Sequence, residues 1–370
     1  MRESTQVRWA LAMLLAGASP AALAAQGSDN TSYGTSAAEF LLLGANARGT
    51  AIGPGFAAIA ADASALYYNP AGIALMKQPE FQASAYDYVA ETDYAWGGIA
   101  FPFGGGARAF GVQLGTFGFS DQPVYTVAQP DGTGALYSVS QTFVGLTYAQ
   151  NFSDRFSAGL TAKAVFDELG EARGSAFAVD FGTNFHSQLG GHPISFSFTL
   201  VNLGSNLSYS GEALNVDVPR DDADEDQVPN NPQPGQYRTK GFSLPTTFRV
   251  GLAYDLIAKQ NTRFTVVGDF NQPTSNKAGF SLGTEMAFAR LGGSGFGAAV
   301  RGSYTYQPAN NIEVTDASLT ALTDEENLQG LAFGGGLMYQ TSGFSLGVDY
   351  AYRYMGVLGP TNFFSFAVGF

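Results

Sequence analysis

Three things are scarce in this chain: cysteine, charge and long apolar runs. The absence of cysteine among 370 residues excludes a disulfide framework and any thiolate for catalysis or metal binding. Charged residues make up 13%, whereas soluble domains carry roughly 25%. Beyond the N-terminal region, no stretch reaches the about 20 apolar residues that a membrane-spanning helix needs. A disulfide scaffold, a thiol enzyme and a helical membrane protein are therefore all disfavoured.

The composition that remains suits β-structure. Aromatic residues make up 14%, and there are 47 glycines, as in strands and the aromatic girdles of membrane barrels. A large β-sandwich or propeller fits the composition as well. The formal net charge of −13 argues against nucleic acid as a partner, because that role needs a basic surface.

The N-terminus has the pattern of an export signal. Arg2 and Arg8 precede an apolar run at 9–15, and Ala22-Leu23-Ala24 forms an A-x-A cleavage site. This predicts a signal peptide over 1–25, with a buried N-terminal helix as the alternative. An exported chain without a helical anchor is periplasmic, secreted or an outer-membrane barrel.

Alternation with period 2 dominates the sequence after residue 80. In 344–352, for example, Phe344, Leu346 and Val348 alternate with Ser345 and Gly347. Strands with one apolar face have this pattern, and many run about ten residues, the length of a tilted spanning strand. About fourteen strands are expected, at 81–90, 92–103, 108–119, 137–149, 155–167, 174–186, 193–203, 245–256, 261–270, 277–290, 294–307, 329–340, 343–354 and 361–370. The predicted fold is therefore all-β, a transmembrane antiparallel β-barrel over 81–370.

The connections between these strands sort by length. Alternate links are short, whereas the long ones, 120–136, 204–244 and 308–328, all belong to the other set. Short turns on one rim and long loops on the other are typical of outer-membrane barrels. The loop 204–244 carries an acidic cluster at 221–226, which we interpret as a solvated loop, with a calcium site as the sharper alternative.

Charged residues on the non-aromatic strand faces are expected to line the lumen. An arginine facing lipid at the midplane would cost roughly 2–4 kcal/mol, which favours the inward assignment. Buried charges need partners, so we expect ion pairs across the lumen or to a plug, rather than a substrate path. These lumen charges are Lys163, Asp180, Arg249, Asp269, Glu285, Arg301, Asp349 and Arg353.

The segment 26–80 lacks strand alternation and is rich in alanine and glycine. A barrel of about fourteen strands encloses a lumen wide enough to hold it. We predict that it forms an N-terminal plug or hatch, with a periplasmic tail as the alternative.

This segment also carries a resemblance to a known family. Residues 39–53 read EFLLLGANARGTAIG, and 56–74 read FAAIAADASALYYNPAGIA; VNLG at 201–204 and LPTTFRVGL at 244–252 follow. The chain resembles the PorV/PorQ family of outer-membrane proteins over most of its mature length, although TAIG at 50–53 departs from an expected Gly-Met-Gly-like stretch. The signature residues are Gly44, Arg48, Asp62, Asn69, Pro70 and Gly72. An Asn-Pro-Ala-Gly run is physically a turn of fixed geometry, suited to pinning a plug to the wall. The aromatic last strand, ending in Phe370, resembles the signal read by the outer-membrane assembly machinery.

Two functions follow from resemblance. PorV-like proteins bind the C-terminal domains of exported cargo in type IX secretion, which implies a protein partner at the outer loops and a closed lumen. The Asn-Pro-Ala-Gly element and the strand count also resemble FadL-type channels for hydrophobic compounds. That hypothesis implies an apolar pocket beside the plug and a gap or kink in the wall, for which glycines at 97–98, 104–106 and 334–336 are candidates.

An enzymatic role is not expected. The only histidines are His186 and His192, at a predicted periplasmic turn, and no nucleophile with a matched base, Walker loop, zinc spacing or dinucleotide motif occurs. We therefore expect no cofactor and no metal. The expected location is the outer membrane of a Gram-negative-type envelope, with its lipid as a partner.

Overall fold

The computed structural model describes residues 34–218, 233–308 and 329–370. The predicted signal peptide over 1–25 and the acidic cluster at 221–226 lie outside these ranges. No helix in the described residues is long and apolar enough to cross a membrane.

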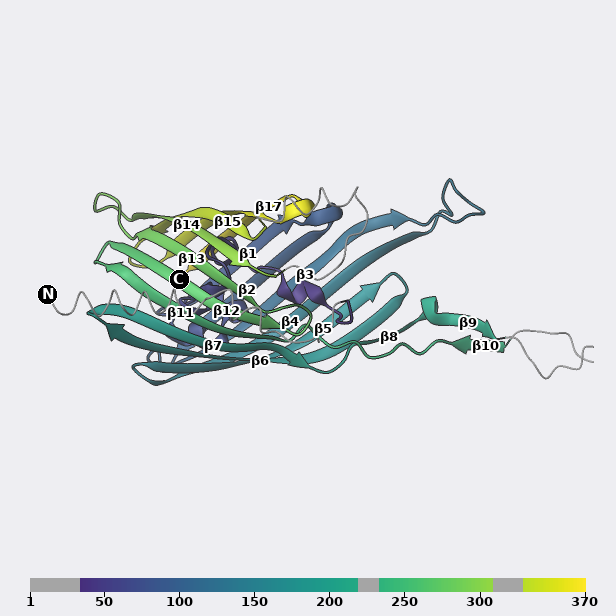
Figure 1. The fold of residues 1–370 in the computed structure, drawn as a ribbon, viewed down its shortest axis with the longest axis horizontal. Helices are drawn as coiled ribbons and strands as arrows, with labels where there is room; N and C mark the ends of the chain where they lie inside the picture. The colour runs from purple at the N-terminus through teal and green to yellow at the C-terminus, as the bar shows by residue number, and fades with distance from the viewer. Residues whose placement is uncertain (1–33, 219–232, 309–328) are drawn as a thin grey trace, which may run out of the picture.

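Fourteen long strands form the wall (Figure 1). They are β1 (Glu80–Asp87), β2 (Asp93–Phe103), β3 (Arg108–Pro123), β4 (Leu136–Ser153), β5 (Phe156–Leu169), β6 (Ala172–Leu189), β7 (His192–Gly204), β11 (Thr247–Ala258), β12 (Thr262–Pro273), β13 (Gly279–Phe288), β14 (Phe296–Tyr306), β15 (Leu331–Gln340), β16 (Ser345–Tyr354) and β17 (Pro360–Gly369).

Every wall strand pairs antiparallel with its neighbours in the ring. The first and last strands close it, with Glu80 opposite Gly369 and Ala85 opposite Phe364. The predicted all-β fold, a closed antiparallel barrel of fourteen strands, is confirmed. Closure leaves the wall without a free sheet edge, as a barrel in lipid requires.

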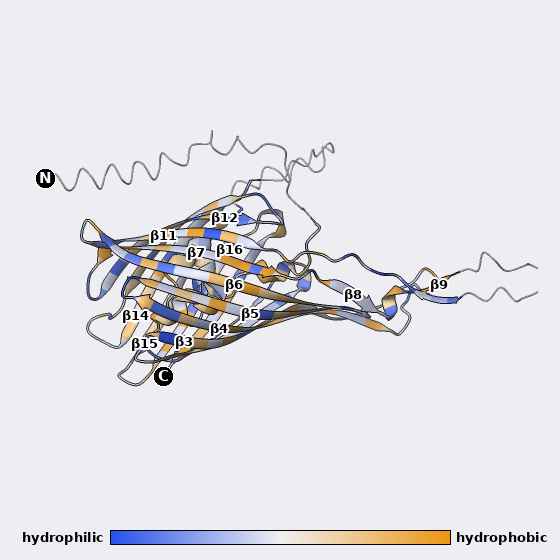
Figure 2. Ribbon diagram, turned by 90° about the horizontal axis from the view of Figure 1, so that it is seen from below, coloured by the Kyte–Doolittle hydropathy of each residue, from blue (hydrophilic) through white to orange (hydrophobic). Residues whose placement is uncertain are grey.

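Apolar side chains point outward along these strands. On β14, Val300 is 66% exposed, whereas the next residue, Arg301, is 5% exposed. The same alternation recurs around the ring, and Figure 2 shows hydrophobic and hydrophilic bands alternating along the wall strands. An outer face of exposed Phe, Leu, Val and Tyr is stable only against an apolar surrounding, which a lipid bilayer supplies.

The two rims differ in the length of their connections. Tight turns join β2 to β3, β4 to β5 and β6 to β7 on the rim where β17 ends. On the other rim lie the long connections, including an arm made of β8 (Ser208–Gly211), η5 (Glu212–Leu214), β9 (Asn215–Val218) and β10 (Gln233–Gln236), which projects well beyond the barrel (Figures 1 and 2). The single turns η4 (Val89–Glu91) and η7 (Gly356–Leu358) also connect strands here.

The described part of the N-terminal segment packs against the inner face of the wall. It consists of η1 (Glu39–Leu42), α3 (Ala47–Ile52), η2 (Pro54–Ala58), α4 (Ala65–Tyr68) and η3 (Pro70–Leu75). α3 contacts β13 to β17, η2 contacts β7 and β11 to β13, and η3 contacts β2 to β6. Because the contacted strands are distributed around the whole ring, the segment lies inside it. Its residues form most of the buried core. Whether it works as a plug stays a prediction.

Local sequence explains the short helices. The Asn46 side chain caps α3 by accepting a hydrogen bond from the Gly49 N–H at 2.8 Å. Gly53, with φ of 83°, ends α3, and Pro54 starts η2 in the first-turn position that proline favours. The segment therefore changes direction every few residues, which fits it into a round lumen.

Glycines in the wall let the segment approach. A Cβ at Gly283 would lie 2.0 Å from the Ile52 carbonyl oxygen, and one at Gly182 would lie 2.2 Å from Asn69 Oδ1. A side chain at either position would push the segment off the wall. These glycines serve close packing rather than a break in the ladder.

Candidate functional site in the barrel lumen

A chain of alternating charges links the segment to the wall through Arg48 on α3. Arg48 Nη1 lies 2.7 Å from Asp62 Oδ2, and Nη2 lies 2.9 Å from Glu285 Oε1 on β13. Its Nε donates a second hydrogen bond to Glu285, so this pair is bidentate. Burial lowers the pKa of the Arg48 guanidinium, but the Glu285 and Asp62 carboxylates raise it by more, so the side chain stays charged.

The charge chain continues along the wall. Arg301 Nε on β14 lies 2.7 Å from Glu285 Oε2, and Arg301 Nη1 contacts Asp349 on β16. Glu285 and Arg301 are almost fully buried, so each depends on its partners for the solvation that water would give. The structure thus brings five of the predicted residues, Arg48, Asp62, Glu285, Arg301 and Asp349, into one network.

A second charged pair lies next to a bulge in β7. Lys163 Nζ on β5 is 2.6 Å from Asp180 Oδ2 on β6, and both side chains are buried. Lys163 also donates to Asn202 Oδ1 at 2.9 Å, and the Asn202 N–H donates to Asp180 Oδ1 at 2.8 Å. Asn202 has φ of 60°, where two residues of β7 oppose one of β6. The pair therefore holds the bulge in place.

The Asn-Pro-Ala-Gly element joins the segment to β6. The fully buried Asn69 side-chain amide donates to the carbonyl of Ala57 at 3.0 Å and to Asn184 Oδ1 at 2.9 Å. Its Oδ1 accepts from the Ala71 N–H at 3.1 Å, and Pro70 stands at the first position of η3. A Cβ at Gly72 would lie 2.1 Å from the Ala60 carbonyl oxygen. All three signature residues therefore have structural roles at this junction.

Gly44, the remaining signature residue, lies where the segment meets β1. Its carbonyl accepts a hydrogen bond from the Tyr86 hydroxyl at 3.1 Å. A Cβ at Gly44 would lie 2.5 Å from Thr50 Oγ1, so the position leaves no room for a side chain. Tyr67 nearby donates to the Leu41 carbonyl at 2.9 Å.

Three predicted lumen charges lie apart from these networks. Arg249 on β11 donates one long hydrogen bond, 3.4 Å, to Asn271 on β12. Asp269 accepts a hydrogen bond from Ser281. Arg353 on β16 faces the small lumen cavity of about 50 Å³ that Arg249 also lines. Two basic groups, Arg249 and Arg353, therefore line this lumen cavity.

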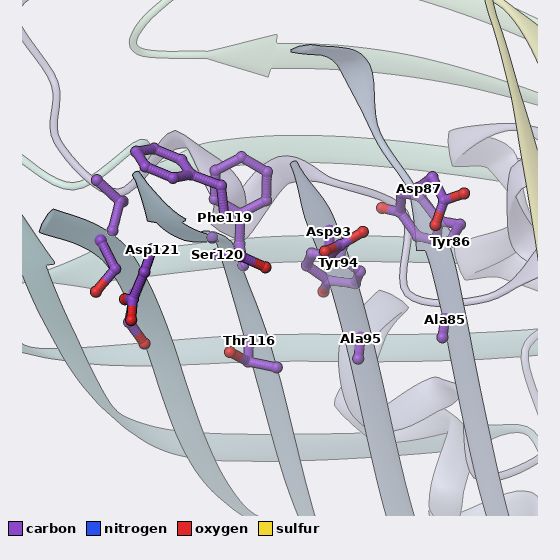
Figure 3. Close-up of a pocket in the computed structure, with 15 residues that line it drawn as sticks. Ala85, Tyr86, Asp87, Asp93, Tyr94, Ala95, Thr116, Phe119, Ser120 and Asp121 are labelled. Carbon is purple, nitrogen blue, oxygen red and sulfur yellow. The ribbon is translucent and has the colours of Figure 1, made fainter. Parts of the chain in front are cut away.

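A larger depression lies on the wall near the ends of β1 to β4 (Figure 3). Its volume is about 530 Å³. Ala85 and Ala95 line it and alternate with the buried Tyr86 and Tyr94, so they project from the outer face of the barrel. It is therefore not the apolar pocket beside the segment that a FadL-like channel is expected to have.

The histidines are placed differently from expectation. His186 lies within β6 rather than in a turn, and its Nδ1 is 2.9 Å from Ser195 Oγ. His192 Nδ1 is 2.9 Å from the Asp255 carbonyl oxygen. The turn is shorter than the predicted 187–192, because β6 continues to Leu189 and β7 already begins at His192.

Uncharged polar residues complete the site, and they were not among the residues predicted from the sequence. Asn184 binds Asn69, Asn202 holds the bulge, and Gln113 donates to the Leu66 carbonyl at 2.6 Å while accepting from Trp96. Asn184 alternates in step with Asp180 along β6, so the period that placed Asp180 in the lumen would have found it.

No protein-family model and no curated protein sequence matches this chain. Among solved structures, the toluene transporter TodX from Pseudomonas putida is similar, with 11% identity, a TM-score of 0.50, and coverage of 92% of this chain and 99% of TodX. The Ralstonia pickettii toluene transporter TbuX gives 10% identity and a TM-score of 0.50, with coverage of 86% and 97%.

The chain therefore shares the fold of these two toluene transporters, and in this chain that fold is a closed fourteen-strand barrel. At this level of identity the likeness concerns the fold. The comparisons provide no support for the PorV/PorQ resemblance or for a role in secretion.

Proposed function

We propose that the chain is an outer-membrane channel for small hydrophobic molecules, exported by a cleaved N-terminal signal. The main support is the shared fold, which extends over 92% of this chain and 99% of TodX, a protein described as a toluene transporter. The apolar outer face supports a bilayer location, because a lipid-facing barrel needs such a face.

In this proposal the segment over 34–79 is the hatch. It fills the lumen, and its contacts with the wall include displaceable ion pairs at Arg48 and hydrogen bonds at Asn69. The small size of the lumen cavity, about 50 Å³, means that a permeant molecule passes only when the hatch shifts. The bulge at Asn202 supports the proposal, because a bulge bends a strand and a FadL-like channel is expected to have a gap or kink in its wall.

Uptake tests the proposal. Gram-negative cells without a hydrocarbon channel of their own would express the chain, and the uptake of labelled toluene would be compared with that of a hydrophilic sugar. The expected result is faster toluene entry with no change for the sugar. Equal rates with and without the chain would refute the proposal.

Secretion is the second candidate, and the closely packed lumen favours it because a cargo-binding barrel has no need of a passage. Its test is a pull-down of the folded chain with candidate cargo C-terminal domains. Binding at the long-loop rim, together with no effect on toluene entry, would favour secretion over transport.

A further inference from the structure

The lumen cavity lies at a junction between the segment and several parts of the wall. Tyr67 and Tyr68 line it from α4, and Arg249, Ser303 and Arg353 line it from β11, β14 and β16. A group bound there would touch the segment and three wall strands at once.

The arginines of the lumen cavity form no ion pair within the described residues. The Arg353 side chain makes no hydrogen bond there, and the Arg249 side chain makes only its 3.4 Å contact with the Asn271 amide. Asp269, a carboxylate on the same inner face, interacts electrostatically with Arg249 but accepts its side-chain hydrogen bond from Ser281. Each guanidinium has five N–H donors, so most of the donors on these two side chains have no acceptor within the described residues.

One hydroxyl at the lumen cavity is also unsatisfied. Ser303 is 7% exposed, and its Oγ has no hydrogen-bond partner within the described residues. The Tyr68 hydroxyl lies close to Thr50 and the Asn46 backbone, and burial raises its pKa, so it keeps its proton and can donate. Native proteins seldom leave a buried hydroxyl unpaired, so Ser303 points to a bound acceptor.

We propose that this lumen cavity binds one small oxyanion, a phosphate, sulfate or carboxylate group. Two guanidinium groups and two hydroxyl donors match the acceptor oxygens and the charge of such a group. The oxyanion bridges the segment to β11, β14 and β16, so its binding stabilises the seated position of the hatch. This role in regulating the hatch rests on the proposed function, whereas oxyanion binding itself does not.

Inorganic phosphate is the first probe. The purified chain in a neutral detergent is titrated with sodium phosphate against sodium chloride at equal ionic strength, and the thermal midpoint is recorded. The expected result is a saturable rise in the midpoint for the parent chain. The matched control Arg173→Gln, at an arginine exposed on β6, is expected to behave like the parent. The absence of a saturable rise in the parent would overturn the proposal.

Arg353→Gln is the critical variant. Because Arg353 has no partner in the described residues, its loss should leave the fold intact, and we expect at least a tenfold weaker response to phosphate, as for loss of one charged contact. Ser303→Ala, a smaller change, is expected to weaken it less. A response in Arg353→Gln equal to the parent's would show that phosphate binds elsewhere and would overturn the proposal.

A final titration distinguishes a free oxyanion from the headgroup of an amphiphile. Tighter binding of octyl phosphate than of inorganic phosphate would assign the lumen cavity to a headgroup, and equal binding would assign it to a free oxyanion. Octanol that bound as tightly as octyl phosphate would contradict both. These titrations involve no transport, so their failure leaves the toluene test unaffected, and the reverse also holds.

Discussion

At the scale of single residues, Arg48 is the cation that joins the segment to the charged wall. Its substitution by glutamine leaves Asp62 without its cation and Glu285 with Arg301 alone. Breaking a buried pair costs about 3–5 kcal/mol, and Arg48 is partly exposed, so we expect a loss of about 2 kcal/mol in the free energy of unfolding. Urea unfolding followed by tryptophan fluorescence measures this.

The fluorescence has a defined source. The chain contains two tryptophans, and Trp9 lies in the predicted signal, so Trp96 would be the reporter of the processed protein. Trp96 binds Gln113, which binds Leu66 of the segment, so its emission senses the seating of the segment. Arg173→Gln is the matched control. If both variants unfolded at the same urea concentration, the ion pairs of Arg48 would have no stabilising role.

Asn69 tests the signature element. Its amide N–H groups face three acceptors, the carbonyls of Ala57 and Thr183 and Asn184 Oδ1. Asn69→Asp replaces these donors with a carboxylate, so we expect it to destabilise the protein more than Asn69→Ala, which adds no buried charge. The reverse order in urea midpoints would mean that the Asn69 amide does not pin the segment.

The strand face on which a residue lies could be predicted from the sequence, whereas its interaction partner could not. Alternation places Arg301 and Glu285 on the inner face because apolar residues, such as Val300 and Met286, alternate with them on the outer face. It cannot pair Arg48 with Glu285, because they are 237 positions apart and only the packing of the segment inside the ring brings them together. The role of Asn202 was also hidden, because a bulge shifts the strand period at that point.

At the scale of elements, β13 and α3 fit together because Gly283 has no side chain. A Cβ there would lie 2.0 Å from the Ile52 carbonyl oxygen, whereas at Gly268, on the outer face of β12, the nearest atom is at 3.7 Å. Gly283→Ala should therefore displace the segment, raising amide hydrogen exchange over 47–58, and Gly268→Ala should not. Equal exchange in the two variants would contradict this packing.

The wall strands were predictable because lipid outside and polar contacts inside impose a strict period of two. The arm was not, because β9 and β10, with four residues each, are too short to show a period. The short helices of the segment were missed for a related reason. They are set by caps such as Asn46 and by contact with the wall, and not by an amphipathic repeat.

At the scale of the whole molecule, the proposed transport function requires that the hatch moves when a permeant passes. The chain has no cysteine, so an introduced pair can form only one intramolecular disulfide. A Cβ at Gly55 of η2 would lie 3.3 Å from Val267 Cβ on β12, close to the about 3.5–4.5 Å of a disulfide. Gly55→Cys with Val267→Cys would therefore lock the hatch to the wall.

Toluene uptake by cells carrying this double variant is the most direct test. We expect entry to stop when the disulfide is oxidised and to recover on reduction, with each single-cysteine variant transporting throughout. Uptake that is as fast in the oxidised state as in the reduced state would contradict the account, because a fixed segment would then not obstruct the path.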